Sequence, residues 1–95
     1  MKLWLDDLRP APPGWAHVKT AGEAINALQT GTVEKIALDH DLGDPDINGT
    51  GYLVVCWMKE NNIWPEWVRV HSMNPTGAAR MNQVIFEHLH EKRRK

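Results

Sequence analysis

The stretch IALDHDLGD, residues 36–44, decides the fold because it joins an apolar run directly to ionisable residues. The apolar run has no alternating polar residues, as a strand with one solvent-exposed face would have, so it indicates a strand buried within a parallel sheet. Asp39, His40 and Asp41 follow at once, where this strand meets its loop. Ionisable residues at that position in so small a chain are the first indication of a functional site.

Two further apolar runs end in the same way. Near the N-terminus, LWLDDLRP places Asp6 and Asp7 after a short apolar run, and VRVHSMNP ends another with His71 and Ser72. In open α/β sheets, ligands bind at the carboxyl ends of the strands. We therefore expect these polar side chains to converge on one edge of a sheet.

The order of the elements indicates an α/β fold. Strands are predicted over residues 2–6, 16–20, 34–40 and 66–72, helices over 20–31, 50–62 and 74–94, and loops over 8–15 and 41–51. Strands that alternate with helices favour a parallel sheet with right-handed crossovers. We expect one domain, residues 1–95, with a parallel sheet of about four strands and about three helices.

Capping residues mark the starts of the predicted helices. Thr20 and Glu23 have the spacing of a capping box, and Thr50 lies near the start of the second helix. Asn74 is the expected cap of the last helix, with Pro75 at its first position.

The composition describes a soluble globular chain of 95 residues, enough for one modest core. Its formal net charge of −1 gives no general attraction to nucleic acid, so DNA is not an expected partner. The single cysteine excludes an internal disulfide framework and a cysteine-rich zinc site. Without a signal peptide or a membrane-spanning run, we expect a cytoplasmic protein that does not contact a membrane.

Aspartates at the predicted strand ends form a candidate metal site, made of Asp6, Asp7, Asp39 and Asp41. If the third strand continues, Asp39 and Asp41 lie two residues apart and face the same way. Packed carboxylates repel one another unless protons or a cation offset their charge. Oxygen ligands suit a hard divalent ion, Mg²⁺ first, and nearby histidines widen the choice to Mn²⁺. The aspartates of the GDPDING turn are expected only to cap or stabilise that turn.

Histidines and phosphate-binding groups lie beside these carboxylates. His71 and His40 can give or take a proton near neutral pH, so both are candidate catalytic residues. Arg9 follows the first aspartate pair, where its guanidinium could hold a phosphate. Ser72 and Asn74 precede the last helix, whose N-terminal amides favour an anion. A metal, an arginine and a helix N-terminus around one cleft suit a phosphate ligand.

Five tryptophans are unusual in so short a chain. Trp4 and Trp57 fit core positions in a predicted strand and helix. Trp15, Trp64 and Trp67 lie near predicted loops, where they could line a pocket or cover the edge of the core.

The motifs resemble the receiver domain of response regulators, which implies a small receiver-like (flavodoxin-like) sheet. LDDLRP resembles the acidic pair after its first strand, and VHSMNP resembles the strand end with a small hydroxyl residue. DLGDPDING, residues 41–49, resembles the segment that begins at the phosphoacceptor aspartate. The gap-free match makes Asp41 the phosphoacceptor equivalent and a further catalytic candidate, although Asp39 also ends the apolar run.

The chain also differs from an ordinary receiver. PAPPGW stands in place of the first helix, and the last strand with its lysine is absent. The pattern over residues 2–81 is instead very similar to the cyclic-phosphate processing receiver domain family. That resemblance implies a metal-supported site acting on a cyclic phosphate, either the 2′,3′-cyclic phosphate end of an RNA or a cyclic nucleotide.

Three functions are compatible with these residues. The first is a metal-dependent cyclic phosphodiesterase in which His71 or His40 activates water or protonates the leaving hydroxyl. The second is a module that binds a cyclic nucleotide or phosphate without cleaving it. The third is a degenerate receiver used in protein interaction. The sheet edge exposed by the missing strand could pair with a second copy to form a homodimer.

Overall fold

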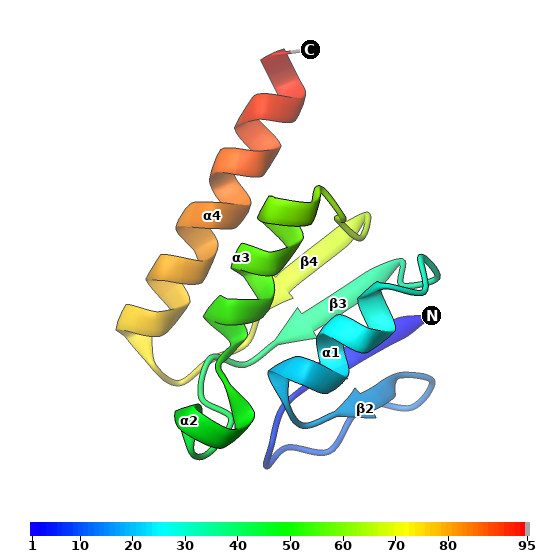
Figure 1. The fold of residues 1–95 in the computed structure, drawn as a ribbon, viewed down its shortest axis with the longest axis vertical. Coiled ribbons are helices and arrows are strands. Elements are labelled where there is room, and N and C mark those ends of the chain that lie inside the picture. The colour runs from blue at the N-terminus through cyan, green and yellow to red at the C-terminus, as the bar shows by residue number, and fades with distance from the viewer. Residues whose placement is uncertain (95) are drawn as a thin grey trace.

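Strands and helices alternate along the chain in the computed structural model, which describes residues 1–94 and the side chains of residues 1–91 (Figure 1). In chain order, the elements are β1 (Lys2–Leu5), β2 (Ala16–Val18), α1 (Ala21–Leu28), β3 (Lys35–Leu38), α2 (Pro45–Asn48), α3 (Gly51–Asn61), β4 (Trp67–Val70) and α4 (Pro75–Arg94).

The sheet has four strands in the order β2-β1-β3-β4, and every neighbouring pair is parallel. This confirms the predicted receiver-like α/β fold, because the order matches the first four strands of a flavodoxin-like sheet. After β1, the chain forms β2 on one side of β1 and then β3 on the opposite side of β1. The switch point of the topology therefore lies between the carboxyl ends of β1 and β3, where ligands bind in such folds.

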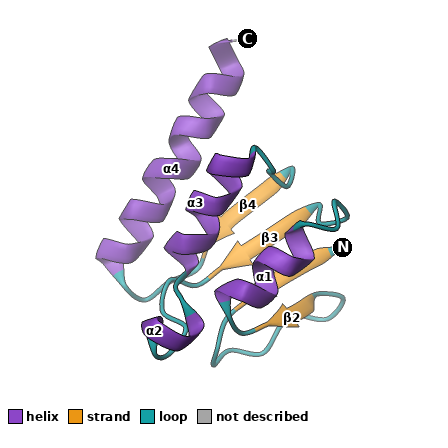
Figure 2. Ribbon diagram, viewed as in Figure 1, coloured by secondary structure: helices purple, strands orange, loops and turns teal. Residues whose placement is uncertain are grey.

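The helices α1, α3 and α4 pack on one face of the sheet (Figure 2). Leu3, Leu5, Ile36 and Leu38 alternate toward that face and are fully buried against the helices. Each fully buried leucine or isoleucine contributes about 1.5–3 kcal/mol of transfer free energy, and the buried residues of the helices complete this core. None of the described helices is long and apolar enough to cross a membrane.

The helix starts follow the predicted caps. The Thr20 hydroxyl accepts the Glu23 amide at 3.2 Å, and the Thr50 hydroxyl accepts the Leu53 amide at 3.3 Å. The Asn74 side-chain oxygen accepts the amide of the third residue of α4 at 3.0 Å. These bonds satisfy amides that have no partner inside the first turn of a helix.

Two local predictions were wrong. The segment predicted as a loop over residues 41–51 contains α2, a single turn capped by the Asp44 carboxylate, which accepts the Asp46 amide at 2.9 Å. The third strand ends at Leu38, not at residue 40, because the chain turns so that Asp41 forms an antiparallel bridge with Thr50. Asp39 and Asp41 therefore do not lie along one extended strand.

Candidate functional site

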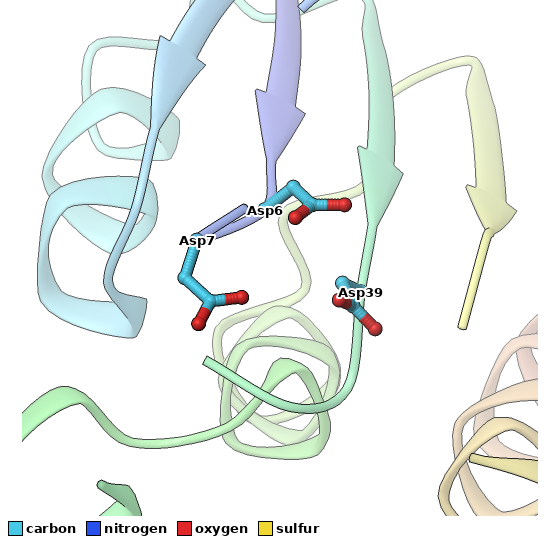
Figure 3. A group of neighbouring side chains, drawn as sticks. All are labelled: Asp6, Asp7 and Asp39. Carbon is cyan, nitrogen blue, oxygen red and sulfur yellow. The ribbon is translucent and has the colours of Figure 1, made fainter. Parts of the chain in front are cut away.

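Three carboxylates gather at the switch point of the sheet. Asp6, Asp7 and Asp39 each offer one oxygen, and these oxygens all lie within 4.8 Å of one another (Figure 3). Asp6 and Asp39 hold these positions because the strand ladder continues one residue past β1 and β3. The Asp6 amide donates to the Val18 carbonyl at 3.1 Å, and the Asp39 amide donates to the Leu5 carbonyl at 2.9 Å.

Asp6 is a buried carboxylate held by the backbone that follows it. Its Oδ1 accepts the amides of Leu8 and Arg9, each at 2.8 Å, and its Oδ2 lies 3.1 Å from His71 Nε2. Burial opposes the charge, but the Arg9 and Leu8 amides and His71 together hold the pKa of Asp6 below its ordinary value. Asp6 is therefore ionised and fixed in one orientation.

Asp7 and Asp39 differ from Asp6 in having free carboxylates. Among the residues whose side chains are described, no donor forms a hydrogen bond with either carboxylate, although Asp39 is only 9% exposed. Buried charges in proteins are usually paired or bound to a metal. These two carboxylates are consequently available to a ligand that enters between them.

His71 positions Asp6. Its ring is stacked on Trp4, with centroids 4.0 Å apart and planes inclined by 10°. Its Nδ1 is buried and has no hydrogen-bond partner among the described residues, so a proton there would be unsatisfied. Burial lowers the pKa of His71, and the hydrogen bond to Asp6 offsets this only in part. His71 is thus a neutral imidazole that donates its Nε2–H to Asp6, and this geometry favours a positioning role over the predicted acid–base role.

Asp41 belongs to a second cluster that includes His40, Asn74 and Ser72. Asp41 Oδ1 lies 2.8 Å from His40 Nδ1 and accepts the Asn74 side-chain amide at 3.2 Å. The hydrogen bonds from His40 and Asn74 lower the pKa of Asp41, whose side chain is 63% exposed. Asp41 does not belong to the group of three carboxylates that lie within 4.8 Å.

Asn74 and Ser72 organise the start of α4. The Ser72 hydroxyl accepts the Asn74 amide at 3.1 Å, which closes a tight turn. The Asn74 side chain uses its oxygen to cap the helix and its nitrogen to hold Asp41. Both ends of this amide are therefore occupied within the protein, whereas the Ser72 hydroxyl keeps its own proton to donate.

A cavity of about 360 Å³ extends from the three carboxylates to Asp41, and the other residues of the second cluster do not line it. It is lined by Asp6, Asp7, Leu8, Arg9, Asp39, Asp41, Gly43 and Met73. The volume lies in the range of small-molecule sites. Arg9 brings a cation to this wall, with Nε 3.9 Å from Asp6 Oδ2 and the side chain 44% exposed. The cavity thus places carboxylates able to ligate a cation beside a guanidinium able to bind an anion.

Two glycines that sequence reasoning did not single out shape this site. A Cβ on Gly51 would collide with the Asp39 carbonyl oxygen, so only glycine lets the start of α3 approach the end of β3. A Cβ on Gly77 would collide with the His40 ring in the same way. The only sequence signal was their place at a helix start, in NGTGY and NPTGA.

The chain was compared with known protein families, curated proteins and solved structures. The model of the cyclic-phosphate processing receiver domain matches residues 1–87. Neither curated proteins nor solved structures give a match. The matched range contains every strand and every residue of the two clusters described above.

Proposed function

The chain belongs to the cyclic-phosphate processing receiver family, and on this premise we propose that it is a metal-dependent enzyme that opens cyclic phosphodiesters. The substrate would be the 2′,3′-cyclic phosphate end of an RNA or a cyclic nucleotide. The observation that carries the proposal is the meeting of Asp6, Asp7 and Asp39 within 4.8 Å, in one cavity with Arg9.

The donor set fits a hard divalent ion. Asp7 and Asp39 have no hydrogen-bond donor among the described side chains, and three carboxylates this close repel one another without a cation. Asp6 is oriented by His71, the kind of outer hydrogen bond that supports metal ligands. Oxygen-only ligands favour Mg²⁺ or Mn²⁺. A bound ion would polarise the phosphodiester and lower the pKa of bound water.

Arg9 and Asp41, which also line the cavity, and His40, the partner of Asp41, have roles of their own in the proposed reaction. Arg9 would hold a non-bridging phosphate oxygen and stabilise the charge that develops there. Asp41 and its partner His40 would accept a proton from the attacking water. The water oxygen forms a bond to phosphorus, one ring P–O bond breaks, and the freed ribose oxygen takes up a proton. The product is a phosphomonoester.

Two observations favour a second function, binding without cleavage. The lowered pKa of Asp41 makes it a weak base, and both nitrogens of His71 are shielded from the cavity by Asp6 and by burial. A site with carboxylates for a metal and an arginine for a phosphate, but a weak base, would hold a cyclic phosphate and release it unchanged.

A turnover assay on the purified chain separates these functions. The substrates are an RNA with a 2′,3′-cyclic phosphate end and a panel of cyclic mono- and dinucleotides, each with Mg²⁺, Mn²⁺ or EDTA. We expect ring opening that needs the metal and is lost in Asp39→Asn. Asp46→Asn is the matched control, because Asp46 is exposed in α2 and lies outside the cavity.

Each result of this assay has a separate meaning. Metal-dependent binding of a cyclic phosphate with no ring opening would support the binding module. Ring opening that persists in EDTA or in Asp39→Asn would contradict the role given to the three carboxylates. Neither binding nor opening by the wild type would overturn both functions.

A further inference from the structure

The face of the sheet opposite α1, α3 and α4 carries a distinct set of side chains. Side chains alternate along each strand, and the buried leucines point to the helices, so the alternate positions point away from them. We call this surface the open face, and on the strands it consists of Lys2, Trp4, His17, Lys35, Ala37, Trp67 and Arg69.

The register of the strands arranges the open face in rows across the sheet. The first row places Lys2 beside Lys35, and Lys35 beside Trp67. The second row runs from His17 through Trp4 and Ala37 to Arg69.

The next positions on the same side of the sheet are Asp6, Asp39 and His71, where the ladder continues past the strand ends. The stacking of His71 on Trp4 confirms that these positions share one side. The open face therefore leads directly to the carboxylate cavity.

Three tryptophans form an aromatic platform on this face. Trp15, from the loop between β1 and β2, packs edge-on against Trp4 at 6.3 Å and against Trp67 at 5.9 Å between ring centroids. All three side chains remain partly exposed. Partly exposed indole rings offer surfaces on which nucleic-acid bases stack, whatever the base.

Cations flank this aromatic platform. The Lys35 ammonium lies 5.9 Å and the Arg69 guanidinium 5.3 Å from the centroid of the Trp67 ring. Within the described side chains, Lys2, Lys35 and Arg69 have no carboxylate within 4.0 Å, and Lys35 and Arg69 are exposed. The chain as a whole carries a formal net charge of −1, so this concentration of positive charge is local.

We propose that the open face binds single-stranded RNA and directs its 3′ end into the carboxylate cavity. Bases would stack on the tryptophans, and the phosphates would contact Lys2, Lys35 and Arg69. The choice of RNA rests on the proposed function, because a 2′,3′-cyclic phosphate requires the 2′-hydroxyl of a ribose. A second copy of the chain fits this face poorly, since like charges would meet across a symmetric contact.

The test measures binding in the absence of catalysis. A fluorescent RNA of about eight nucleotides, within the usual site size of a single domain, carries a 3′-hydroxyl end that cannot be opened. Its anisotropy is followed in EDTA with the wild type, with Arg69→Ala and with Lys35→Ala. The matched controls are Arg80→Ala and Lys59→Ala, which remove the same charges from α4 and α3 on the helical side.

We expect the wild type to bind and each open-face variant to bind about fivefold or more weakly. The slope of log Kd against log salt concentration should fall by about 0.7 for each phosphate contact that is lost. The control variants should bind as tightly as the wild type, and an RNA duplex should compete poorly because its bases are not free to stack. Quenching of tryptophan fluorescence by the RNA would place the bases on the indole rings.

Several outcomes would overturn the proposal. These are the absence of RNA binding by the wild type, equal weakening by the control variants, and binding that is insensitive to Arg69→Ala and Lys35→Ala. A monomer–dimer equilibrium that those two substitutions abolish would assign the face to a second copy instead. Ring opening of a cyclic mononucleotide together with no RNA binding would overturn this proposal while the proposed enzyme stands.

Discussion

The imidazole of His71 lies flat on the indole of Trp4, and the same ring meets Asp6 Oδ2 through Nε2 at 3.1 Å. Trp4 is in turn held by a hydrogen bond from its Nε1 to the Arg9 carbonyl at 3.0 Å. A stacked ring with one nitrogen engaged and the other buried has little freedom to exchange protons with a substrate. The arrangement instead fixes the direction of a carboxylate at the end of β1.

Replacing His71 tests this positioning role. His71→Phe retains a flat ring on Trp4 but removes the donor to Asp6, which keeps its two backbone amides. We expect the affinity for Mn²⁺, measured by titration calorimetry, to fall about 10-fold to 100-fold, as it does when such supporting hydrogen bonds are lost. His90→Phe is the control, because His90 is exposed on α4. Unchanged Mn²⁺ affinity in His71→Phe would remove the positioning role.

The pKa of His71 makes stability depend on pH in a defined direction. Burial lowers this pKa from 6.5 in the folded state, so below pH 6.5 the unfolded chain binds more protons than the folded one. The free energy of unfolding should therefore be highest above pH 6.5 and fall as the pH drops toward the folded-state pKa. Urea unfolding in EDTA between pH 7.5 and pH 5 measures this.

The contribution of His71 is isolated by comparison with His71→Phe, since the other histidines titrate in both proteins. We expect the curve of the variant to be flatter in this range. Asp6 affects stability only at lower pH. Because its pKa is lowered in the folded state, its contribution to the free energy of unfolding is lost as the pH falls below 3.8, its ordinary pKa. Parallel curves for the wild type and His71→Phe would show that the folded state tolerates a protonated His71.

The sequence allows the meeting of Asp6, Asp7 and Asp39 to be predicted because strand ends are local features. Asp6, Asp7 and Asp39 each follow an apolar run, and parallel topology brings such positions to one edge of the sheet. Asp41 lies in the same stretch of sequence as Asp39, but the structure places it outside the group of three carboxylates. Its position depends on where β3 stops, at the turn that brings Asp41 to Thr50 and the Asp39 carbonyl close to Gly51, and the apolar pattern of the strand does not show these contacts.

The role of His71 cannot be predicted from the sequence for a similar reason. A histidine after a strand suggests acid–base chemistry, but only the register places it over Trp4 and beside Asp6. Trp4 itself was expected in the core. Alternation instead turns it to the opposite face of the sheet from Leu3 and Leu5. The single turn of α2 is too short to give a helical periodicity, so the sequence predicts a loop there.

Gly51→Ala tests the close contact between the start of α3 and the end of β3. The added methyl would collide with the Asp39 carbonyl oxygen, and backbone cannot move aside as a side chain can. We expect a loss of about 1–3 kcal/mol in the free energy of unfolding, together with weaker Mn²⁺ binding because Asp39 shifts.

Gly22→Ala is the control for this substitution. Gly22 also lies in the first turn of a helix, but a Cβ there meets nothing within 4 Å. This change should be neutral or stabilise the protein by about 0.5 kcal/mol. Equal stability of the two alanine variants would show that α3 approaches Asp39 less closely than described.

The Asn74 side chain caps α4 and also donates a hydrogen bond to Asp41. Two substitutions separate these roles. Serine is also a good cap, so Asn74→Ser should leave the free energy of unfolding within about 0.5 kcal/mol of the wild type, whereas Asn74→Ala should cost about 1 kcal/mol. Both variants lose the hydrogen bond from the Asn74 amide to Asp41. We therefore expect the pKa of Asp41 to rise in both, while the hydrogen bond from His40 still holds it below 3.8.

Carbon-detected NMR titration of the Asp41 carboxyl measures this pKa directly. If it rises in Asn74→Ala but not in Asn74→Ser, the change follows from fraying of α4 and not from the lost hydrogen bond. If it rises equally in both, Asn74 lowers the basicity of Asp41 directly. A faster turnover of cyclic phosphate by the stable Asn74→Ser variant would then identify Asp41 as the proton acceptor, because a carboxylate with a higher pKa is the stronger base.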